Sequence, residues 1–168
     1  MHSYKIKTDR LLLRPLTVAD AEAVYKWVSD ERVARYMVYL TYTDIEKLKD
    51  WLRSVETDDS TYIFGFERLE DGELIGSGDI GPKDDGYWSF GYNLRYDCWG
   101  MGYATEAAKA MIKFAKDNFG ADKFESSHCE PNQASGRVME KCGLHFVGYS
   151  DFEKLDGSCK MRSMDYRT

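Results

Sequence analysis

Two closely spaced glycines, Gly100 and Gly102, lie in the segment RYDCWGMGYATEAAKAMIKFA, just before a stretch with the composition of a helix. A helix N-terminus presents unpaired N–H groups and the positive end of the helix dipole, and both attract phosphate oxygens. Glycine has no Cβ, so a glycine-containing backbone can approach such oxygens closely. The segment therefore predicts either a tight turn alone or a site for a phosphate-bearing ligand, such as a dinucleotide.

The composition argues against several other functional classes. The chain has 23 basic and 29 acidic residues, a formal net charge of −6, and it lacks the basic stripe that a nucleic-acid groove needs. The four cysteines contain no CxxC pair and the three histidines form no ligand pattern, so we expect reduced thiols and no metal. No apolar stretch can span a bilayer, and the N-terminus MHSYKIKTDR lacks the apolar block of a signal peptide. We therefore expect a cytoplasmic protein that has no membrane or nucleic-acid partner and forms one domain over 1–168.

Hydrophobic periodicity predicts the elements before the glycine segment. Residues 6–16 predict a strand, and residues 17–30 predict a helix with Thr17 as its N-cap. A second helix is predicted over 43–55. Between 61 and 94 the period changes from helical to alternating, and Asp-Gly pairs separate three strand-like runs. Asp-Gly between alternating runs is a strong hairpin signal, so this region predicts an antiparallel meander.

The elements after the glycine segment alternate between helix and strand. We predict an alanine-rich helix over 103–120, a strand over 122–130, a short helix over 132–143 and a final hairpin around Asp156-Gly157. The resulting order is β-α-α-β-β-β-α-β-α-β-β. It is typical of an α+β fold with a mixed sheet and one parallel crossover through the long helix.

A dinucleotide site fits this order poorly. GMGYAT matches only the first half of G-x-G-x-x-G because Thr105 occupies the place of the third glycine. Glu125, near the expected acidic position, makes the match superficially possible. That fingerprint, however, belongs to the first βα turn of a doubly wound parallel sheet, whereas an antiparallel meander precedes the glycines here.

The chain instead resembles the GNAT superfamily of acetyl-CoA-dependent N-acetyltransferases, in particular its ribosomal-protein N-terminal acetyltransferase-like branch. The resemblance covers essentially the whole chain and is strongest at FGYNLRYDCWGMGYATEA and PNQASGRVMEKCGLHFVG. The family's cofactor motif, Gln/Arg-x-x-Gly-x-Gly/Ala, falls on residues 99–104, where Gly102 and Ala104 fit and Trp99 departs from it. The resemblance implies a mixed, mostly antiparallel twisted sheet with helices on both faces. It also implies one splayed parallel strand pair, 87–95 and 123–129.

The resemblance further implies where acetyl-CoA, the co-substrate, would bind. The pantetheine arm would lie between the two splayed strands, beside backbone polar groups near Asn93 and Leu94. Asn132 and Ser135 would meet its other side. The pyrophosphate would lie on the N–H groups of the glycine segment, which are those of Trp99, Gly100, Met101, Gly102, Tyr103, Ala104 and Thr105.

The catalytic groups are less completely specified. Many relatives carry a tyrosine acid where this chain has Met139, so Ser135 becomes the candidate acid, with helix capping or CoA contact as its alternative role. An attacking amine is mostly protonated at neutral pH and needs a base. The branch often has a glutamate where this chain has Ser89, which leaves His128 as a candidate base or a half-buried strand histidine. Glu106 is explained by the helix dipole alone.

Residues outside the motifs suggest further contacts. Arg137 and Lys141 are candidates for the CoA 3′-phosphate or for solvated surface charges, and Tyr39 and Tyr42 are candidates for the acceptor pocket. The implied reaction is direct attack of an amine, from a protein N-terminus or a small molecule, on the thioester. The alternatives are a polyamine or aminoglycoside-type acetyltransferase and a non-catalytic acyl-CoA-binding module. The protein itself is expected to be a monomer or a homodimer.

Overall fold

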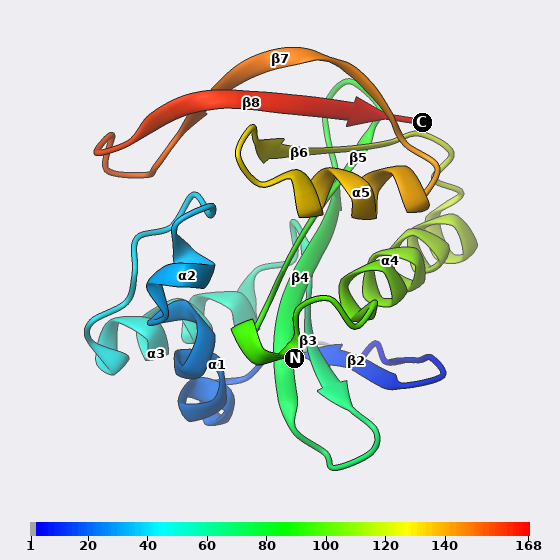
Figure 1. Cartoon of the computed structure of the whole chain (residues 1–168). Coiled ribbons are helices and arrows are strands. Elements are labelled where there is room, and N and C mark those ends of the chain that lie inside the picture. Colours follow the sequence, from blue (N-terminus) through cyan, green and yellow to red (C-terminus); the bar gives the residue numbers. More distant parts are fainter. Residues whose placement is uncertain (1–2) are drawn as a thin grey trace.

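The computed structural model describes residues 3–168, so His2, one of the three histidines, lies outside the described part. Within these residues the chain forms one twisted eight-stranded sheet in the order β1-β2-β3-β4-β5-β6-β8-β7 (Figure 1). Helices α4 (Tyr103–Phe119) and α5 (Gln133–Lys141) cover one face, and helices near the N-terminus cover the other. The predicted α+β architecture is confirmed.

The predicted strand over 6–16 is wrong, because the structure has two short strands there. They are β1 (Ile6–Lys7) and β2 (Leu11–Pro15), which pair in an antiparallel hairpin. Thr8 closes the turn between them by donating its N–H to the Leu11 carbonyl at 2.9 Å. Its hydroxyl also donates to Glu106, far along the chain, at 2.7 Å. A distant carboxylate helps to fix the turn, and no local pattern can reveal it.

The helix predicted over 17–30 is also divided. Thr17 precedes a single 3₁₀ turn (Val18–Asp20), and helix α1 (Ala21–Val28) follows directly. The Asp20 carboxylate accepts a hydrogen bond from the Thr17 N–H at 2.8 Å, and this bond joins the last residue of the turn to the residue before it. A further short helix, α2 (Glu31–Ala34), was not predicted.

Helix α3 (Ile45–Thr57) confirms the second predicted helix, with Asp44 as its N-cap, whose side chain accepts from the Glu46 N–H at 2.9 Å. Helices α1 and α3 bury their apolar sides on one face of the sheet. The largest buried side chains of this layer are Leu16, Trp27, Leu48 and Leu52. Burial of such side chains stabilises the layer by about 1.5–3 kcal/mol each.

The predicted meander is confirmed as β3 (Tyr62–Arg68), β4 (Leu74–Pro82) and β5 (Trp88–Leu94). All its pairs are antiparallel. The two Asp-Gly turns place their glycines at positive φ, 71° at Gly72 and 86° at Gly86, which explains why glycine is needed there.

The parallel crossover runs from β5 through α4 to β6 (Phe124–Cys129). Strands β5 and β6 pair only at Trp88↔Phe124 and Ser89↔Glu125, and they separate beyond this point. Helix α5 then leads into the hairpin of β7 (His145–Glu153) and β8 (Lys160–Arg167), in which β8 lies beside β6. The splayed pair is therefore present, and α4 and α5 pack on the sheet face opposite α1 and α3.

Within residues 3–168, no helix has both the length and the apolar composition that a membrane-spanning segment needs. The longest helix, α4, has one apolar side that packs on the sheet and one charged side. Its apolar residues therefore serve the core.

Candidate active site

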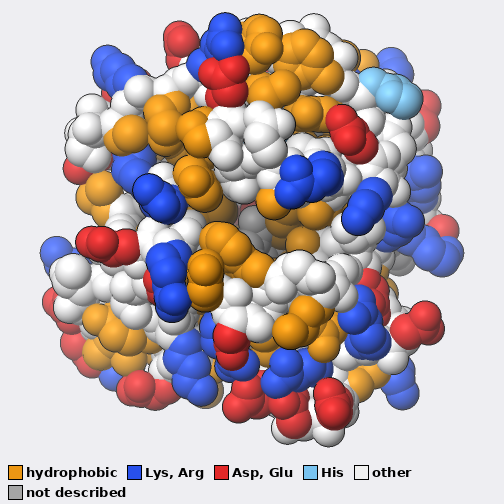
Figure 2. Space-filling view, in the orientation of Figure 1, with side chains coloured by type: hydrophobic (Ala, Val, Ile, Leu, Met, Phe, Trp, Pro, Cys, Tyr) orange, Lys and Arg blue, Asp and Glu red, His pale blue; other side chains and the backbone are white. Residues whose placement is uncertain are grey.

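A cavity of about 270 Å³ lies where β5 and β6 separate. In the space-filling view the middle of this face is hollowed and bordered by hydrophobic and basic side chains (Figure 2). The cavity is bounded by α2 with the residues that follow it (31–42, called the α2 segment here), by the end of β5, by the glycine segment and by α5. The residues that line it are Val33, Tyr36, Met37, Tyr92, Asn93, Leu94, Cys98, Trp99, Gly100, Gly102, Tyr103, Ala104, Thr105, Asn132, Ala134, Ser135, Arg137, Val138 and Lys141.

The glycine segment forms a loop that presents its backbone to this cavity. Gly100 and Gly102 adopt φ values of 75° and 82°, a left-handed conformation that favours glycine. The N–H groups from Gly100 to Thr105 find no acceptor within residues 3–168, and the first helical bond of α4 is donated by Glu106 to the Gly102 carbonyl at 3.1 Å. The loop is thus a row of free donors at the positive end of a 17-residue helix.

An ion pair between Arg10, in the turn before β2, and Glu106 of α4 holds the loop in place. Arg10 Nε donates to Glu106 Oε2 at 2.7 Å, and its Nη1 donates to the Met101 carbonyl at 2.8 Å. Burial opposes ionisation of Glu106, but hydrogen bonds from Thr8 and Arg10 outweigh it and lower the pKa of the carboxyl. Glu106 therefore anchors the turn against the first turn of α4, which is more than the dipole role expected from the sequence.

Trp99 has a structural reason to depart from the family motif. Its indole Nε1 donates to the Leu94 carbonyl at 3.0 Å, which joins the end of β5 to the loop. Its ring also packs against Tyr96, with 4.9 Å between the ring centres. Met101, by contrast, is exposed and does not line the cavity, although its neighbours do.

The side of the cavity nearest α5 holds two hydroxyl groups in contact. Tyr92, on β5, donates its hydroxyl to the Ser135 carbonyl at 2.8 Å, and Ser135 Oγ donates to the Tyr92 hydroxyl at 3.0 Å. Burial raises the pKa of Tyr92, so its hydroxyl stays protonated. The sequence reasoning missed Tyr92 because it lies within the FGY triplet, where alternation predicts only a strand position.

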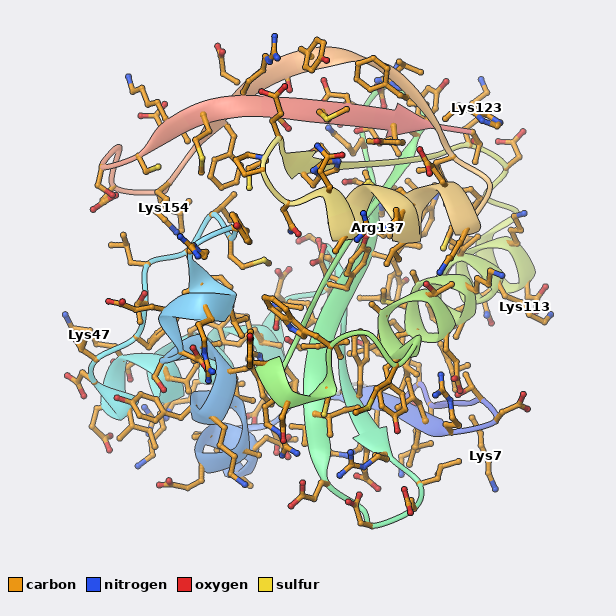
Figure 3. The ribbon with its side chains drawn as sticks, in the orientation of Figure 1. Lys7, Lys47, Lys113, Lys123, Arg137 and Lys154 are labelled. Atoms are coloured by element: carbon orange, nitrogen blue, oxygen red, sulfur yellow. The ribbon has the colours of Figure 1, made fainter. Side chains whose placement is uncertain are left out.

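Two further residues of α5 give the cavity positive charge. Arg137 and Lys141 lie one turn apart on the helix and both line the cavity. Figure 3 shows Arg137 on the side of α5 that faces β5. Asn132 precedes the helix, and its carbonyl accepts from the Ser135 N–H at 3.1 Å. The sequence had left open whether the two cations face the site or the solvent.

His128 lies behind α5 and does not line the cavity. It is buried, its Nδ1 lies 2.8 Å from the Cys129 carbonyl oxygen, and its Nε2 has no partner within the described residues. A Cβ on Gly136 of α5 would come within 2.7 Å of that Nε2, so the helix backbone packs directly on the ring. Met139 is also buried in the core, at 1% exposure.

Another wall of the cavity is formed by the α2 segment. Its lining residues there are Val33, Tyr36 and Met37, whereas Tyr39 packs against Tyr42 outside the lining. Lys154, from the β7–β8 hairpin, donates its ammonium to the carbonyls of Ala34, Met37 and Tyr39 at 2.8, 2.7 and 3.1 Å. This contact fixes the hairpin over the segment. Among residues 3–168, no group of three or more His, Cys, Asp or Glu side chains is arranged to hold a metal ion.

Known proteins share this architecture. The family described as Acetyltransferase (GNAT) domain matches residues 10–145. The chain is 25% identical over 156 residues to an uncharacterized N-acetyltransferase, p20, of Bacillus licheniformis, covering 89% of this chain and 88% of that one. A crystal structure of a GNAT-family acetyltransferase from Bacillus anthracis superposes with a TM-score of 0.84 at 23% identity, covering 98% of each chain.

A second solved structure was obtained with a ligand. RimL, a ribosomal L7/L12 alpha-N-protein acetyltransferase in complex with coenzyme A, superposes with a TM-score of 0.82 at 16% identity, covering 98% of this chain and 97% of that one. At this identity the likeness concerns the fold alone. The family match, in contrast, spans most of the chain and agrees with the splayed strands and the free loop donors described above. The chain belongs to the GNAT acetyltransferase family and is an acetyl-CoA-dependent N-acetyltransferase.

Proposed function

We propose that the enzyme transfers the acetyl group by direct attack of an acceptor amine on the thioester at the split between β5 and β6. One observation carries this proposal. The loop donors, the Tyr92–Ser135 hydroxyl pair and the α2 segment all border one cavity at that split. The thioester would therefore lie between a group that can hold CoA and a wall that can receive an acceptor.

The residues present fit coenzyme A. Free N–H groups from Gly100 to Thr105 match the oxygens of a pyrophosphate, and the left-handed glycines leave no Cβ in the way. Arg137 and Lys141 supply charge for the 3′-phosphate. We assign the pantetheine to the edge of β5 near Asn93 and Leu94, with Asn132 and Ser135 opposite. Met101, Tyr103 and Ala104 contribute through the loop backbone. The Trp99 N–H, which the resemblance had also assigned to the pyrophosphate, is already donated to the Tyr96 carbonyl at 3.2 Å and is not available.

Different parts of the site would stabilise the thioester carbonyl and protonate the leaving group. Beyond Ser89 the edge of β5 that faces β6 is no longer paired in the ladder, so its N–H groups are available to the thioester carbonyl. We assign protonation of the departing CoA thiolate to the Ser135 hydroxyl, which lines the cavity and would turn its proton from Tyr92 toward the sulfur. His128 remains a proposed base only if α5 moves, because the helix now covers its free nitrogen.

The acceptor is proposed to be a protein N-terminus or a small-molecule amine. The test is thiol release from acetyl-CoA across peptides, polyamines and aminoglycosides, together with calorimetric binding of CoA. We expect binding of CoA and turnover with one amine class. Binding without turnover on any amine would instead support a non-catalytic module.

A loop variant tests the CoA site separately. Gly102→Glu places bulk and negative charge against the pyrophosphate, so it should abolish CoA binding. Retained affinity in this variant would overturn the loop assignment. Thermal unfolding of both proteins distinguishes loss of the site from loss of the fold.

A further inference from the structure

A carboxylate that the sequence analysis did not single out lies beside the strand split. Asp79 is on β4, where it pairs with Ile63 of β3 and with Gly91 of β5. Its Oδ1 lies 3.1 Å from the position that a Cβ of Gly91 would occupy. The carboxylate therefore leans over β5 beside the bare backbone of Gly91, where an added Cβ would press on it.

The location of Gly91 brings this carboxylate to the reaction region. Pairing of β5 with β6 ends at Ser89, so Gly91 is already in the separated part of the strand. Its second neighbour along the strand, Asn93, lines the cavity and pairs with Ser77 of β4. Directly opposed and diagonal residues share one face of a sheet, and diagonal neighbours lie about 7–8 Å apart. Asp79 is thus one diagonal step from a residue of the cavity wall.

Asp79 and Tyr92 lie on opposite faces of the sheet. Successive residues of a strand point to opposite sides, so Gly91 and Asp79 face away from α5 while Tyr92 faces toward it. The cavity is lined by both Tyr92 and Asn93, so it reaches both faces at the split. A thioester held there would have the Tyr92–Ser135 hydroxyls on one side and the Asp79 carboxylate on the other.

The surroundings of Asp79 keep it unpaired. Within residues 3–168 its carboxylate has no ion pair and no hydrogen bond, and its same-face neighbours on the flanking strands are uncharged. The charged groups of the elements packed on this face are exposed or engaged elsewhere. On α3, Lys49 binds Glu46, Arg53 binds Asp50 and Glu56 accepts from the Val18 N–H. Glu22 and Lys26 of α1 are exposed, Asp30 binds Arg32, and Lys154 binds backbone carbonyls.

The protein packed around Asp79 changes its ionisation. Part of the residue reaches solvent, but the protein atoms around the carboxyl remove much of its hydration. This desolvation raises the pKa of the carboxyl to about 6. A base in this range is still ionised at neutral pH, and it holds a proton better than an ordinary aspartate, whose pKa is about 3.9. This property supports a role that the position of Asp79 already indicates.

We propose that the Asp79 carboxylate accepts the proton of the acceptor ammonium, directly or through one water, before the nitrogen attacks the thioester. This role rests on the direct attack proposed above. One proton passes from the ammonium to Asp79, and the nitrogen lone pair forms the C–N bond. The C–S bond breaks with its electron pair on sulfur, and the second N–H proton reaches the thiolate from the Ser135 side. Asp79 then releases its proton to solvent, which leaves an amide and CoA thiol.

The test uses Asp79→Asn, which keeps the shape of the side chain and removes its basicity. We expect kcat to fall by about 10²-fold or more, with CoA affinity unchanged, and the acid limb of the wild-type pH profile near pH 6 to disappear. The matched control is Asp84→Asn in the turn between β4 and β5, where the carboxylate is exposed, and it should keep the wild-type profile.

A second variant guards against a purely structural effect. Asp79→Ala opens space at the same position, and added formate should restore part of its rate if a carboxylate base is what is missing. Wild-type kcat and an unchanged acid limb in Asp79→Asn would overturn the proposal. Absence of wild-type turnover on every amine, with CoA bound, would overturn the proposed transfer and the base with it.

Discussion

The hydroxyl groups of Tyr92 and Ser135 lie 3.0 Å apart, and the tyrosine also donates to the serine's own carbonyl at 2.8 Å. This double contact joins β5 to the first turn of α5 across the cavity. It places a protonated phenol behind a serine hydroxyl, in a chain whose last helix has a buried methionine, Met139, where many relatives carry a tyrosine. The proposed acid, Ser135, is thus held in place by a residue of the neighbouring strand.

The first prediction concerns this hydroxyl pair. Ser135→Ala should lower kcat about tenfold while CoA affinity stays unchanged, because the leaving thiolate loses its proton donor. Tyr92→Phe leaves the Ser135 carbonyl without its donor and should cost about 1 kcal/mol of stability as well as activity. Steady-state kinetics and urea unfolding measure both effects. An unchanged kcat in Ser135→Ala would make this serine a cap or a CoA contact only.

The second prediction separates backbone strain from ligand binding in the loop. Gly102→Ala forces a side chain to φ 82° and brings its Cβ within 3.3 Å of Arg10, so stability should fall by about 1–2 kcal/mol. Gly72→Ala, at φ 71° in the distant β3–β4 turn, imposes similar strain with open space around it. Both variants should unfold earlier in urea, but only Gly102→Ala should bind CoA more weakly. Equal CoA affinity in the two would remove the loop from the site.

The third prediction follows from the lowered pKa of Glu106. Its folded-state pKa lies below the unfolded value of about 4.3, so the ionised carboxylate stabilises the fold above that pH. The contribution is lost as the pH falls through the folded pKa. Glu106→Gln should therefore cost about 1 kcal/mol at pH 7 and less at pH 3, as measured by urea unfolding at each pH. Glu70→Gln, at an exposed turn position, is the control and should show no such pH dependence.

The fourth prediction concerns Lys154, which joins the β7–β8 hairpin to the α2 segment, where the acceptor is proposed to bind. Lys154→Met leaves three carbonyls of the α2 segment without their donor, so the KM for the acceptor should rise severalfold while CoA affinity is unchanged. Lys47→Met on α3, which Figure 3 shows pointing outward, is the matched control. An acceptor KM equal to that of the wild type would show that the segment holds its shape without this contact.

Local signals in the sequence determined much of the fold. The Asp-Gly turns, the alternating runs between them and the alanine-rich stretch after Gly102 predicted the meander, the long helix and their order, because each depends on neighbours a few residues apart. The resemblance carried by residues 90–107 and 131–148 predicted the splayed strands. It also pointed to residues that prove to share one cavity, apart from Met101 and His128.

Contacts between distant segments decided the rest. The turn at Thr8 and the role of Glu106 depend on each other across 98 positions, so neither could be inferred from its own surroundings. The alternating pattern of its strand is compatible with His128 facing a cleft. In the structure α5 covers the imidazole instead, because Gly136 has no side chain and lets the helix backbone pack directly on the ring. Asp79 lies beside the split because it pairs with Gly91, which has no side chain. The register that pairs these two residues is fixed only when β4 and β5 assemble in the sheet.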